Sequence, residues 1–272
     1  MPNEKISVIM GVKYRRSSTD LLKRAVDSVL CQSHKDLELI ICERDSSDPA
    51  RELLEKYASE DKRVRLIDGS RAGSFSEQLN LCLAEAKGDW IARMDDDDHS
   101  YPERLEKQLL FLKEHSELAF VGCRCRLVCD GAEVGTTDMP SCPSVRDFLF
   151  SQPFIHPSLL FRKQALEKVK GYSTASRCDR CEDYDLLLRM YEQGLVGCNM
   201  DEILFAYSLP PKGITNRSFR DRLNEVKTRY VRFRSLGLLP RAFPYVVKPI
   251  AVWLIPKRLL SSLKNARNRR NL

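Results

Sequence analysis

Short apolar runs alternate with segments of helical periodicity over the first 120 residues. The runs predict buried strands at residues 6–10, 37–42, 64–67, 90–94 and 119–122. Between them, apolar residues recur at helical spacing and predict helices over residues 19–30, 49–58, 76–86 and 102–115. This alternation predicts an α/β fold with a mostly parallel sheet and helices on both faces.

Polar clusters follow three of the predicted strands, after Met10, Cys42 and Met94. Ligands of open α/β sheets bind at the carboxyl ends of strands, so a site is expected there. No G-x-G-x-x-G follows the first strand, and G-x-x-x-x-G-K-[ST] is absent from the sequence. Both absences disfavour a dinucleotide-binding fold or a P-loop enzyme.

Four consecutive aspartates, Asp95, Asp96, Asp97 and Asp98, directly follow the predicted strand 90–94. An acidic run is usually a solvated loop. Carboxylates fixed at a strand end in a cleft, however, are costly unless a cation neutralises them. Mg²⁺ and Mn²⁺ bind through one or two carboxylates plus substrate phosphates, so we predict a divalent metal site here.

A second acidic pair, Glu182 and Asp183, begins an apolar helical segment. In the plain interpretation these carboxylates stabilise the positive end of the helix dipole. In the alternative, one of them is a general base held by a rigid helix opposite the metal site.

The charge of the 272-residue chain is distributed unevenly. Residues 212–272 hold 16 Lys and Arg against two acids, Asp221 and Glu225, so this segment is +14 and the rest −7, within a total of +7. We predict an acidic body over residues 1–211 and a basic, partly amphipathic helical tail over residues 212–272. Such a tail suits a negatively charged partner.

We consider three interpretations of this tail: it binds a membrane surface, it binds nucleic acid, or it packs on the body. Apolar residues mixed with Lys and Arg over residues 246–263, before a polybasic stretch at 264–270, favour an anionic membrane surface. Nucleic acid is disfavoured, because no RNA- or DNA-binding motif is visible. A helix that packs on the body is the structural alternative.

The N-terminus is polar and no apolar run reaches the roughly 20 residues of a membrane span, so we expect a cytoplasmic protein. Its ten cysteines are then expected to be reduced. Cys178 with Cys181, or Cys123 with Cys125 and Cys129, could bind zinc, but small buried hydrophobes are the plainer interpretation.

Together these motifs resemble the family 2 glycosyltransferases, whose GT-A fold has a Rossmann-like, mostly parallel sheet. The resemblance covers about residues 5–207. It rests on residues 6–10, 25–33, 36–40, 80–98, 102–105, 156–157, 171–172 and 182–186. It implies a nucleotide-binding half at about residues 1–115 and an acceptor half at about residues 116–211.

The resemblance also implies roles for single residues. Asp95, Asp97 and Asp98 would hold Mn²⁺ or Mg²⁺ on the diphosphate of a nucleotide-sugar, and Asp183 would be the catalytic base. The implied nucleotide-sugar-binding residues are Gly11, Tyr14, Glu43, Asn80, Arg93 and Asp96. His156 and Glu182 would face the donor or the acceptor.

The implied activity is metal-dependent and inverting. A hexosyl or N-acetylhexosaminyl group would pass from a UDP-sugar to a hydroxyl of a glycan or lipid-linked acceptor, in bacterial surface polysaccharide synthesis at the inner membrane face. Leu187-Leu188-Arg189 stands where many relatives have a tryptophan, which favours single addition. Arg44, after Glu43, departs from the family's usual second acid. A non-catalytic nucleotide- or glycan-binding scaffold is therefore the alternative.

Overall fold

The computed structural model describes residues 4–13, 19–44, 48–210 and 217–255. Its strands are β1 (Ile6–Lys13), β2 (Leu37–Arg44), β3 (Val64–Asp68), β4 (Trp90–Met94), β5 (His99–Ser100), β6 (Phe120–Cys129), β7 (Ala132–Thr136), β8 (Leu160–Arg162) and β9 (Gly197–Leu209). Its α-helices are α1 (Thr19–Leu30), α2 (Asp48–Glu60), α3 (Phe75–Glu85), α4 (Arg104–Glu114), α5 (Lys163–Lys168), α6 (Glu182–Glu192), α7 (Phe219–Ser235) and α8 (Phe243–Leu254). Three short 3₁₀ helices are η1 (Asp147–Leu149), η2 (His156–Ser158) and η3 (Ser176–Cys178).

The chain divides into two compact units. The first comprises Met1–Thr174 and Glu182–Thr215, and the second comprises Ala175–Cys181 and Asn216–Leu272. The short segment Ala175–Cys181 therefore belongs with the C-terminal helices, although the chain on both sides of it belongs to the first unit. The charge along the chain predicts a continuous body and a continuous tail, and it gives no sign of this crossing.

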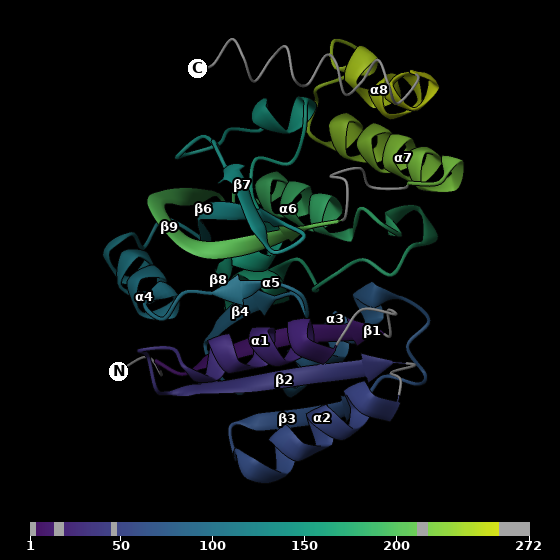
Figure 1. Ribbon diagram of the computed structural model, residues 1–272. Coiled ribbons are helices and arrows are strands. Elements are labelled where there is room, and N and C mark those ends of the chain that lie inside the picture. The colour runs from purple at the N-terminus through teal and green to yellow at the C-terminus, as the bar shows by residue number, and fades with distance from the viewer. Residues whose placement is uncertain (1–3, 14–18, 45–47, 211–216, 256–272) are drawn as a thin grey trace. The chain divides into compact units, whose positions relative to one another are not determined.

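Within the described residues, the first unit holds a nine-stranded sheet of order β3-β2-β1-β4-β8-β6-β9-β5, with β7 paired to β6 (Figure 1). The strands from β3 to β4 are parallel, as are β6 and β9. The short β8 runs antiparallel to β4 and β6, and β5 runs antiparallel to β9. The predicted α/β fold with a Rossmann-like parallel region is confirmed. Its antiparallel strands were not predicted, because they are short or exposed.

The N-terminal elements follow from their residues. All five residues of β4 are buried, which explains why four of them are apolar; the exception is Arg93. Helix α3 begins where the Ser74 side chain accepts a hydrogen bond from the backbone N–H of Glu77, at 3.2 Å. Helix α2 packs near β3, and α3 packs on β1 and β2 (Figure 1). The carboxyl ends of the parallel strands are thus held in fixed positions.

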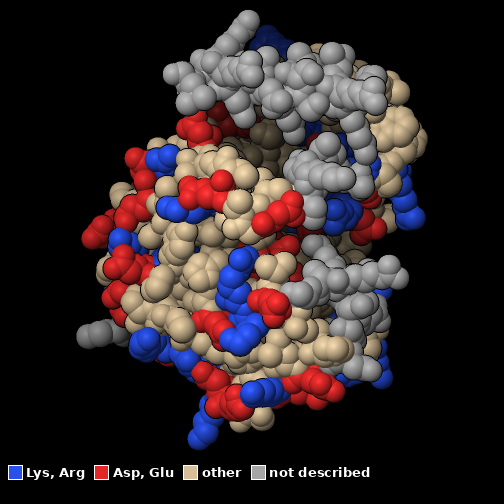
Figure 2. Space-filling model, in the orientation of Figure 1, with Lys and Arg blue, Asp and Glu red and all other residues tan. Residues whose placement is uncertain are grey.

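The surface around α2 carries both signs of charge. On the face drawn in Figure 2, Lys and Arg side chains are interspersed with Asp and Glu side chains over α2 and the strands beside it. The negative charge predicted for the body therefore does not form a single-sign patch on this part of the surface.

The second unit is built on α7 and α8, which pack against each other. A capping box starts α7: the Ser218 hydroxyl accepts from the Asp221 N–H at 3.2 Å, and the Asp221 carboxylate accepts from the Ser218 N–H at 2.8 Å. Phe233 and Val246 are buried within this unit. In the described parts of the chain, none of the helices combines the length and apolar character that a membrane span requires.

The cysteines correct one expectation. Cys142 and Cys198 form a disulfide, with their Cα atoms 4.4 Å apart, so the prediction of ten free thiols is wrong for this pair. The two cysteines are 56 positions apart, and spacing alone gave no sign of their contact. Among the described residues, no three His, Cys, Asp or Glu side chains gather as a metal site. The zinc interpretation of the cysteines therefore gains no support.

Candidate active site

A pocket of about 330 Å³ lies in the first unit. Its walls are Phe75, Arg93, Asp95, Ser151, Gln152, Phe154, Ile155, His156, Pro157, Glu182, Asp183 and Tyr207. These residues come from α3, from β4 and the position directly after it, from η2 and the segment that leads into it, from the start of α6, and from β9. The pocket therefore unites five predicted site residues: Arg93, Asp95, His156, Glu182 and Asp183.

Arg93 and Asp95 form an ion pair at the pocket wall. The Arg93 side chain is only 1% exposed, whereas that of Asp95 is 30% exposed. The guanidinium donates to the Asp95 carboxylate and to the Met94 carbonyl, and it lies 5.2 Å from the centre of the Phe75 ring. A buried arginine thus holds a half-exposed carboxylate toward the pocket.

Asp98 has a different environment from Asp95. Its side chain is fully buried, and Oδ1 accepts a hydrogen bond from the Ser208 N–H at 2.7 Å. Burial, with the nearby Asp95 and Asp97 carboxylates, raises the Asp98 pKa well above its usual range. Ser208 also donates its hydroxyl to the Asp97 carbonyl at 2.5 Å. The quartet is therefore tied to the end of β9, and its fourth member points into the protein.

The metal prediction can be tested against this arrangement. In the part of the chain that the structure describes, no three acidic, His or Cys side chains could jointly hold an ion, so Asp95, Asp97 and Asp98 are not a ready-made cage. Within the described lining of the pocket, Asp95 is the member of the quartet that takes part. This fits a hard cation held by one or two carboxylates together with the phosphates of a bound substrate.

His156 is a buried, neutral member of the pocket wall. Its side chain is 7% exposed, and its Nε2 lies 2.9 Å from the Tyr172 hydroxyl, within hydrogen-bond distance. Burial, and then the positive charge of Arg93, lowers the His156 pKa well below its usual range. The imidazole therefore offers a hydrogen bond to a ligand without adding charge.

Asn80 supports this histidine indirectly. Its Nδ2 donates to the Tyr172 carbonyl at 2.8 Å, and its Oδ1 accepts from the Tyr172 N–H at 2.9 Å. Asn80 is not one of the described residues that line the pocket. Its amide fixes the backbone of Tyr172, the residue whose hydroxyl contacts His156.

Gly171 gives a stability prediction for this support. Its φ is +64°, and an added Cβ would lie 2.6 Å from Asn80 Oδ1. We expect Gly171→Ala to cost about 1–2 kcal/mol for the left-handed backbone plus about 1–3 kcal/mol for the clash. The matched control is Gly194→Ala, because Gly194 has φ +70° and no atom within 4 Å of an added Cβ. Urea unfolding of both variants measures the difference, and equal losses would contradict the clash.

The acidic pair sits on a rigid helix. Glu182 and Asp183 occupy the first turn of α6, most of which is buried. Asp185, fully buried, pairs with Arg189 at 2.7 Å. Arg189 in turn donates to the Gly171 carbonyl at 2.7 Å, which links α6 to the turn before Tyr172. The body of α6 is therefore anchored to the turn before Tyr172, and its first turn presents the two carboxylates to the pocket.

The other predicted nucleotide-binding residues are placed as follows. An added Cβ on Gly11 would lie 2.6 Å from the Phe75 ring, so glycine here allows that ring to reach the pocket. Glu43 is buried at the end of β2, 3.5 Å from Arg51. Gly11, Glu43 and Asp96 are not among the described lining residues, and Tyr14 lies outside the described residues.

Several lining residues were missed by the sequence analysis. Phe75, Gln152, Phe154 and Tyr207 line the pocket. Residues 151–155 have neither helical nor strand periodicity, and Tyr207 lies near the end of a long strand that was not predicted. Two motifs did point to this wall: His156-Pro157 contains the lining residue Pro157, and Gly171-Tyr172 contains the tyrosine that contacts His156.

Comparison with known proteins identifies the family. Residues 7–169 match the family model of Glycosyl transferase family 2. The chain is 34% identical over 258 residues to the "Putative glycosyltransferase EpsE" of Bacillus subtilis, covering 94% of this chain and 92% of that protein. It is 34% identical over 213 residues to the O-antigen biosynthesis glycosyltransferase WbnJ of Escherichia coli, covering 76% and 80%.

Two solved structures share the fold at low sequence identity. S. aureus TarS 1–349 in complex with UDP-GlcNAc has a TM-score of 0.65 and 16% identity, covering 88% of this chain and 73% of that one. The mannosyltransferase PcManGT from Pyrobaculum calidifontis, in complex with GDP-Man and Mn²⁺, has a TM-score of 0.60 and 15% identity, covering 100% and 83%. With a family match over more than half of its length and this shared GT-A fold, the chain belongs to the family 2 glycosyltransferases.

Proposed function

We propose that this pocket transfers a sugar from a nucleotide-sugar to a hydroxyl of a glycan or lipid-linked acceptor, with inversion at the anomeric carbon. The observation that carries the proposal is that Asp95, from the acidic quartet, and Asp183, on the rigid first turn of α6, line one pocket. One carboxylate can then serve the leaving group while the other serves the nucleophile.

On the donor side, we assign contact with the cation and the diphosphate to the half-buried Asp95 and Asp97. Asp98 is given a supporting role because its carboxylate is buried against Ser208. The chemistry that Mn²⁺ or Mg²⁺ would supply there is neutralisation of the negative charge that develops on the departing diphosphate. Arg93 orients Asp95, and Phe75 supplies an apolar wall. The neighbour that was solved with GDP-Man and Mn²⁺ supports a divalent ion.

On the acceptor side, Asp183 accepts the proton of the attacking hydroxyl. An unactivated hydroxyl is a poor nucleophile at neutral pH, and a positioned base contributes about 10²–10⁴-fold. Attack on the face opposite the leaving group inverts the anomeric configuration. Glu182 and the neutral His156 line the same pocket as Asp183, and we propose that they orient the sugar or the acceptor.

The finer identity of the substrates rests on relatives. WbnJ is named for O-antigen biosynthesis, and TarS was solved with UDP-GlcNAc. We therefore propose a UDP-hexose or UDP-N-acetylhexosamine donor, single addition, and a role in bacterial surface polysaccharide synthesis. We also propose that residues 1–211 form the glycosyltransferase domain, with a nucleotide-binding half at about residues 1–115 and an acceptor half at about residues 116–211. Residues 212–272 form the tail.

A donor screen tests this function against a non-catalytic scaffold. Purified protein is incubated with UDP-, GDP- and TDP-sugars plus Mn²⁺, and the released nucleoside diphosphate is measured. The proposal predicts that at least one UDP-sugar is turned over and that EDTA stops the release. A scaffold with a degenerate site would bind a nucleotide or glycan without releasing a diphosphate.

We further propose that the C-terminal unit docks on an anionic membrane surface. Helix α8 exposes Phe243, Val247 and Leu254, which are 51%, 39% and 68% exposed and share one face at i, i+4 and i+11 spacing. The helix has Lys248 and no acid, and residues 212–272 carry +14. An exposed apolar face within a basic segment complements anionic headgroups over an acyl layer.

Deletion of residues 256–272 tests this docking. The deletion removes six Lys and Arg and leaves α8 in place. At about 1 kcal/mol for each basic residue near an anionic surface, we expect binding to phosphatidylglycerol vesicles to fall more than tenfold. Binding of the full chain should also weaken with salt, since the Debye length is about 10 Å at 0.1 M. Co-sedimentation over a salt series measures both effects.

Two further variants separate the apolar contribution. Val247→Glu with Leu254→Glu should abolish vesicle binding. Leu110→Glu on α4 is the control, because Leu110 is an apolar residue of comparable exposure (51%). It should leave vesicle binding unchanged, since Leu110 belongs to the other unit. Donor hydrolysis should persist in all these variants. Equal sedimentation of the full chain and the deletion would refute docking through the tail.

A further inference from the structure

We propose that Thr228, on α7 of the C-terminal unit, is a positioning residue for the general base Asp183. It would act through the segment Ala175–Cys181, which ends directly before Glu182. The inference rests on the proposed function of Asp183 as a base, and it adds a residue that lies far from Asp183 along the chain.

The path of the chain suggests this connection. Ala175–Cys181 groups with α7 and α8, whereas the residues before and after it belong to the first unit. Cys181, Glu182 and Asp183 are consecutive residues joined by peptide bonds. Consecutive Cα atoms are a fixed distance of about 3.8 Å apart, so a shift of Cys181 is passed along the backbone to the first turn of α6.

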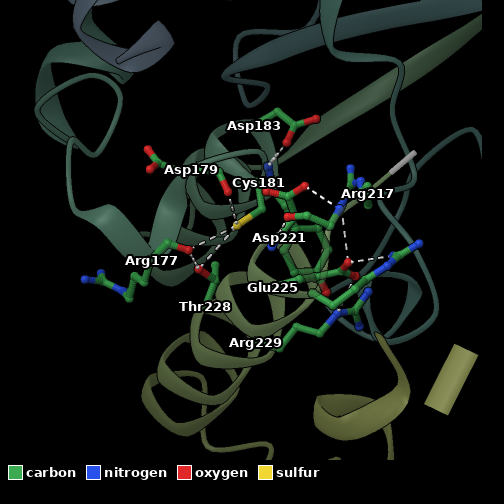
Figure 3. A network of polar contacts seen from close by, with 12 residues as sticks. Arg177, Asp179, Cys181, Asp183, Arg217, Asp221, Glu225, Thr228 and Arg229 are labelled. Atoms are coloured by element: carbon green, nitrogen blue, oxygen red, sulfur yellow. Dashed lines mark hydrogen bonds and ion pairs between the residues drawn. The ribbon is translucent and has the colours of Figure 1, made fainter. Parts of the chain in front are cut away.

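Thr228 holds both ends of the turn that precedes the base. Its side chain is fully buried, and its hydroxyl donates to the Arg177 carbonyl at 2.8 Å. The Cys181 Sγ lies 3.5 Å from Thr228 Oγ1 and 3.3 Å from the same Arg177 carbonyl. Figure 3 shows these three residues meeting around the Thr228 hydroxyl. One side chain therefore connects residues 177 and 181 of the turn.

The turn itself is strained. Arg180 has φ +65°, in the left-handed region that residues with a Cβ rarely adopt. It directly precedes Cys181, whose N–H donates to the Cys178 carbonyl at 2.9 Å. Such a conformation persists only where surrounding contacts hold it, and it is often found where geometry matters for function. Loss of the Thr228 contacts should let this turn relax and move the start of α6.

The expected effect is specific to the chemical step. A base must lie within hydrogen-bond reach of the proton it accepts, and a misplacement of about 1 Å can cost about 100-fold in rate. The donor-side residues Arg93 and Asp95 are fixed by β4 and by each other, not by this turn. Thr228 should therefore affect kcat and leave the affinity for the donor unchanged.

Three variants of the full chain test the proposal, with hydrolysis of the donor identified in the screen as the reaction. Thr228→Val removes the hydroxyl at nearly constant shape, and Thr228→Ser keeps the hydroxyl. We expect Val to lower kcat about tenfold or more with donor KM and Kd within about twofold, and Ser to restore kcat. Ser235→Ala is the control, since it removes an exposed α7 hydroxyl that donates within its own helix, and it should match the wild type.

Each outcome decides the matter. A wild-type kcat in Thr228→Val overturns the proposal. So does a parallel loss of kcat and donor affinity that Ser does not rescue, because that pattern marks a purely structural hydroxyl. If Thr228→Val does not fold, Cys181→Ala removes the thiol contact of the same turn and must lower kcat at constant donor Kd. The failure of Asp183 as the base is seen separately, as wild-type turnover in Asp183→Asn.

Discussion

Replacement of Asp183 by Asn should lower the turnover of the donor by about 10²–10⁴-fold and leave donor affinity within about twofold. Asn keeps the size and hydrogen-bonding capacity of the side chain but cannot accept the proton of the attacking hydroxyl. Because a base acts in the transition state, the loss belongs in kcat rather than in ground-state binding. Steady-state hydrolysis, with calorimetry of the nucleotide, measures both quantities.

The neighbouring carboxylate provides the matched control for this variant. Glu182 lies on the same first turn of α6 and lines the same pocket, so Glu182→Gln removes an equal charge one residue away. We expect it to cost less than about tenfold in kcat, the size of a lost orienting contact. Near wild-type turnover in Asp183→Asn would reduce Asp183 to a charge at a helix terminus.

The second large effect is expected at the acidic quartet. Asp95→Asn and Asp97→Asn should each weaken Mn²⁺-dependent binding of UDP by about 100-fold or more, since even outer ligands of a metal site typically contribute about 10–100-fold. Asn still offers Arg93 an acceptor oxygen, so the buried guanidinium keeps a partner and the fold should survive. Calorimetry with and without Mn²⁺, next to a thermal melt, separates the two effects.

An aspartate away from the pocket completes this experiment. Asp201 is 88% exposed and pairs with Arg124 at the surface, so Asp201→Asn should leave both UDP binding and the melt unchanged. Unaltered metal dependence in Asp95→Asn and in Asp97→Asn would show that these two carboxylates do not hold the ion.

The parallel part of the fold could be predicted because strands that are buried on both faces consist mostly of apolar residues, and such runs are visible in the sequence. Strand β4 was predicted with its observed bounds, since both of its faces are buried and four of its five residues are apolar. The strand predicted at residues 119–122 extends to Cys129. Its second half was not predicted, because these residues are mostly only partly buried and apolar residues alternate with arginines there. Short strands such as β8 and exposed ones such as β7 leave no such pattern.

The site was harder to predict than the fold. The acidic residues were visible because four aspartates after a buried strand are chemically costly. The sequence could not tell which of them face the pocket, and Asp98 turns inward to Ser208. Asn80 has a side chain suited to a ligand, yet both ends of its amide are used by the Tyr172 backbone. The sequence shows which side chains could bind a ligand. Whether such a side chain instead hydrogen-bonds another part of the protein depends on tertiary contacts.

The central claim is that one pocket of the first unit holds the donor between Asp95 and Asp183. A crystal structure of the protein soaked with UDP and Mn²⁺ tests it most directly. We expect electron density for the diphosphate and the ion next to Asp95, in the pocket that Phe75, Arg93 and Asp183 line. Nucleotide bound elsewhere on the protein, with this pocket filled only by solvent, would contradict it.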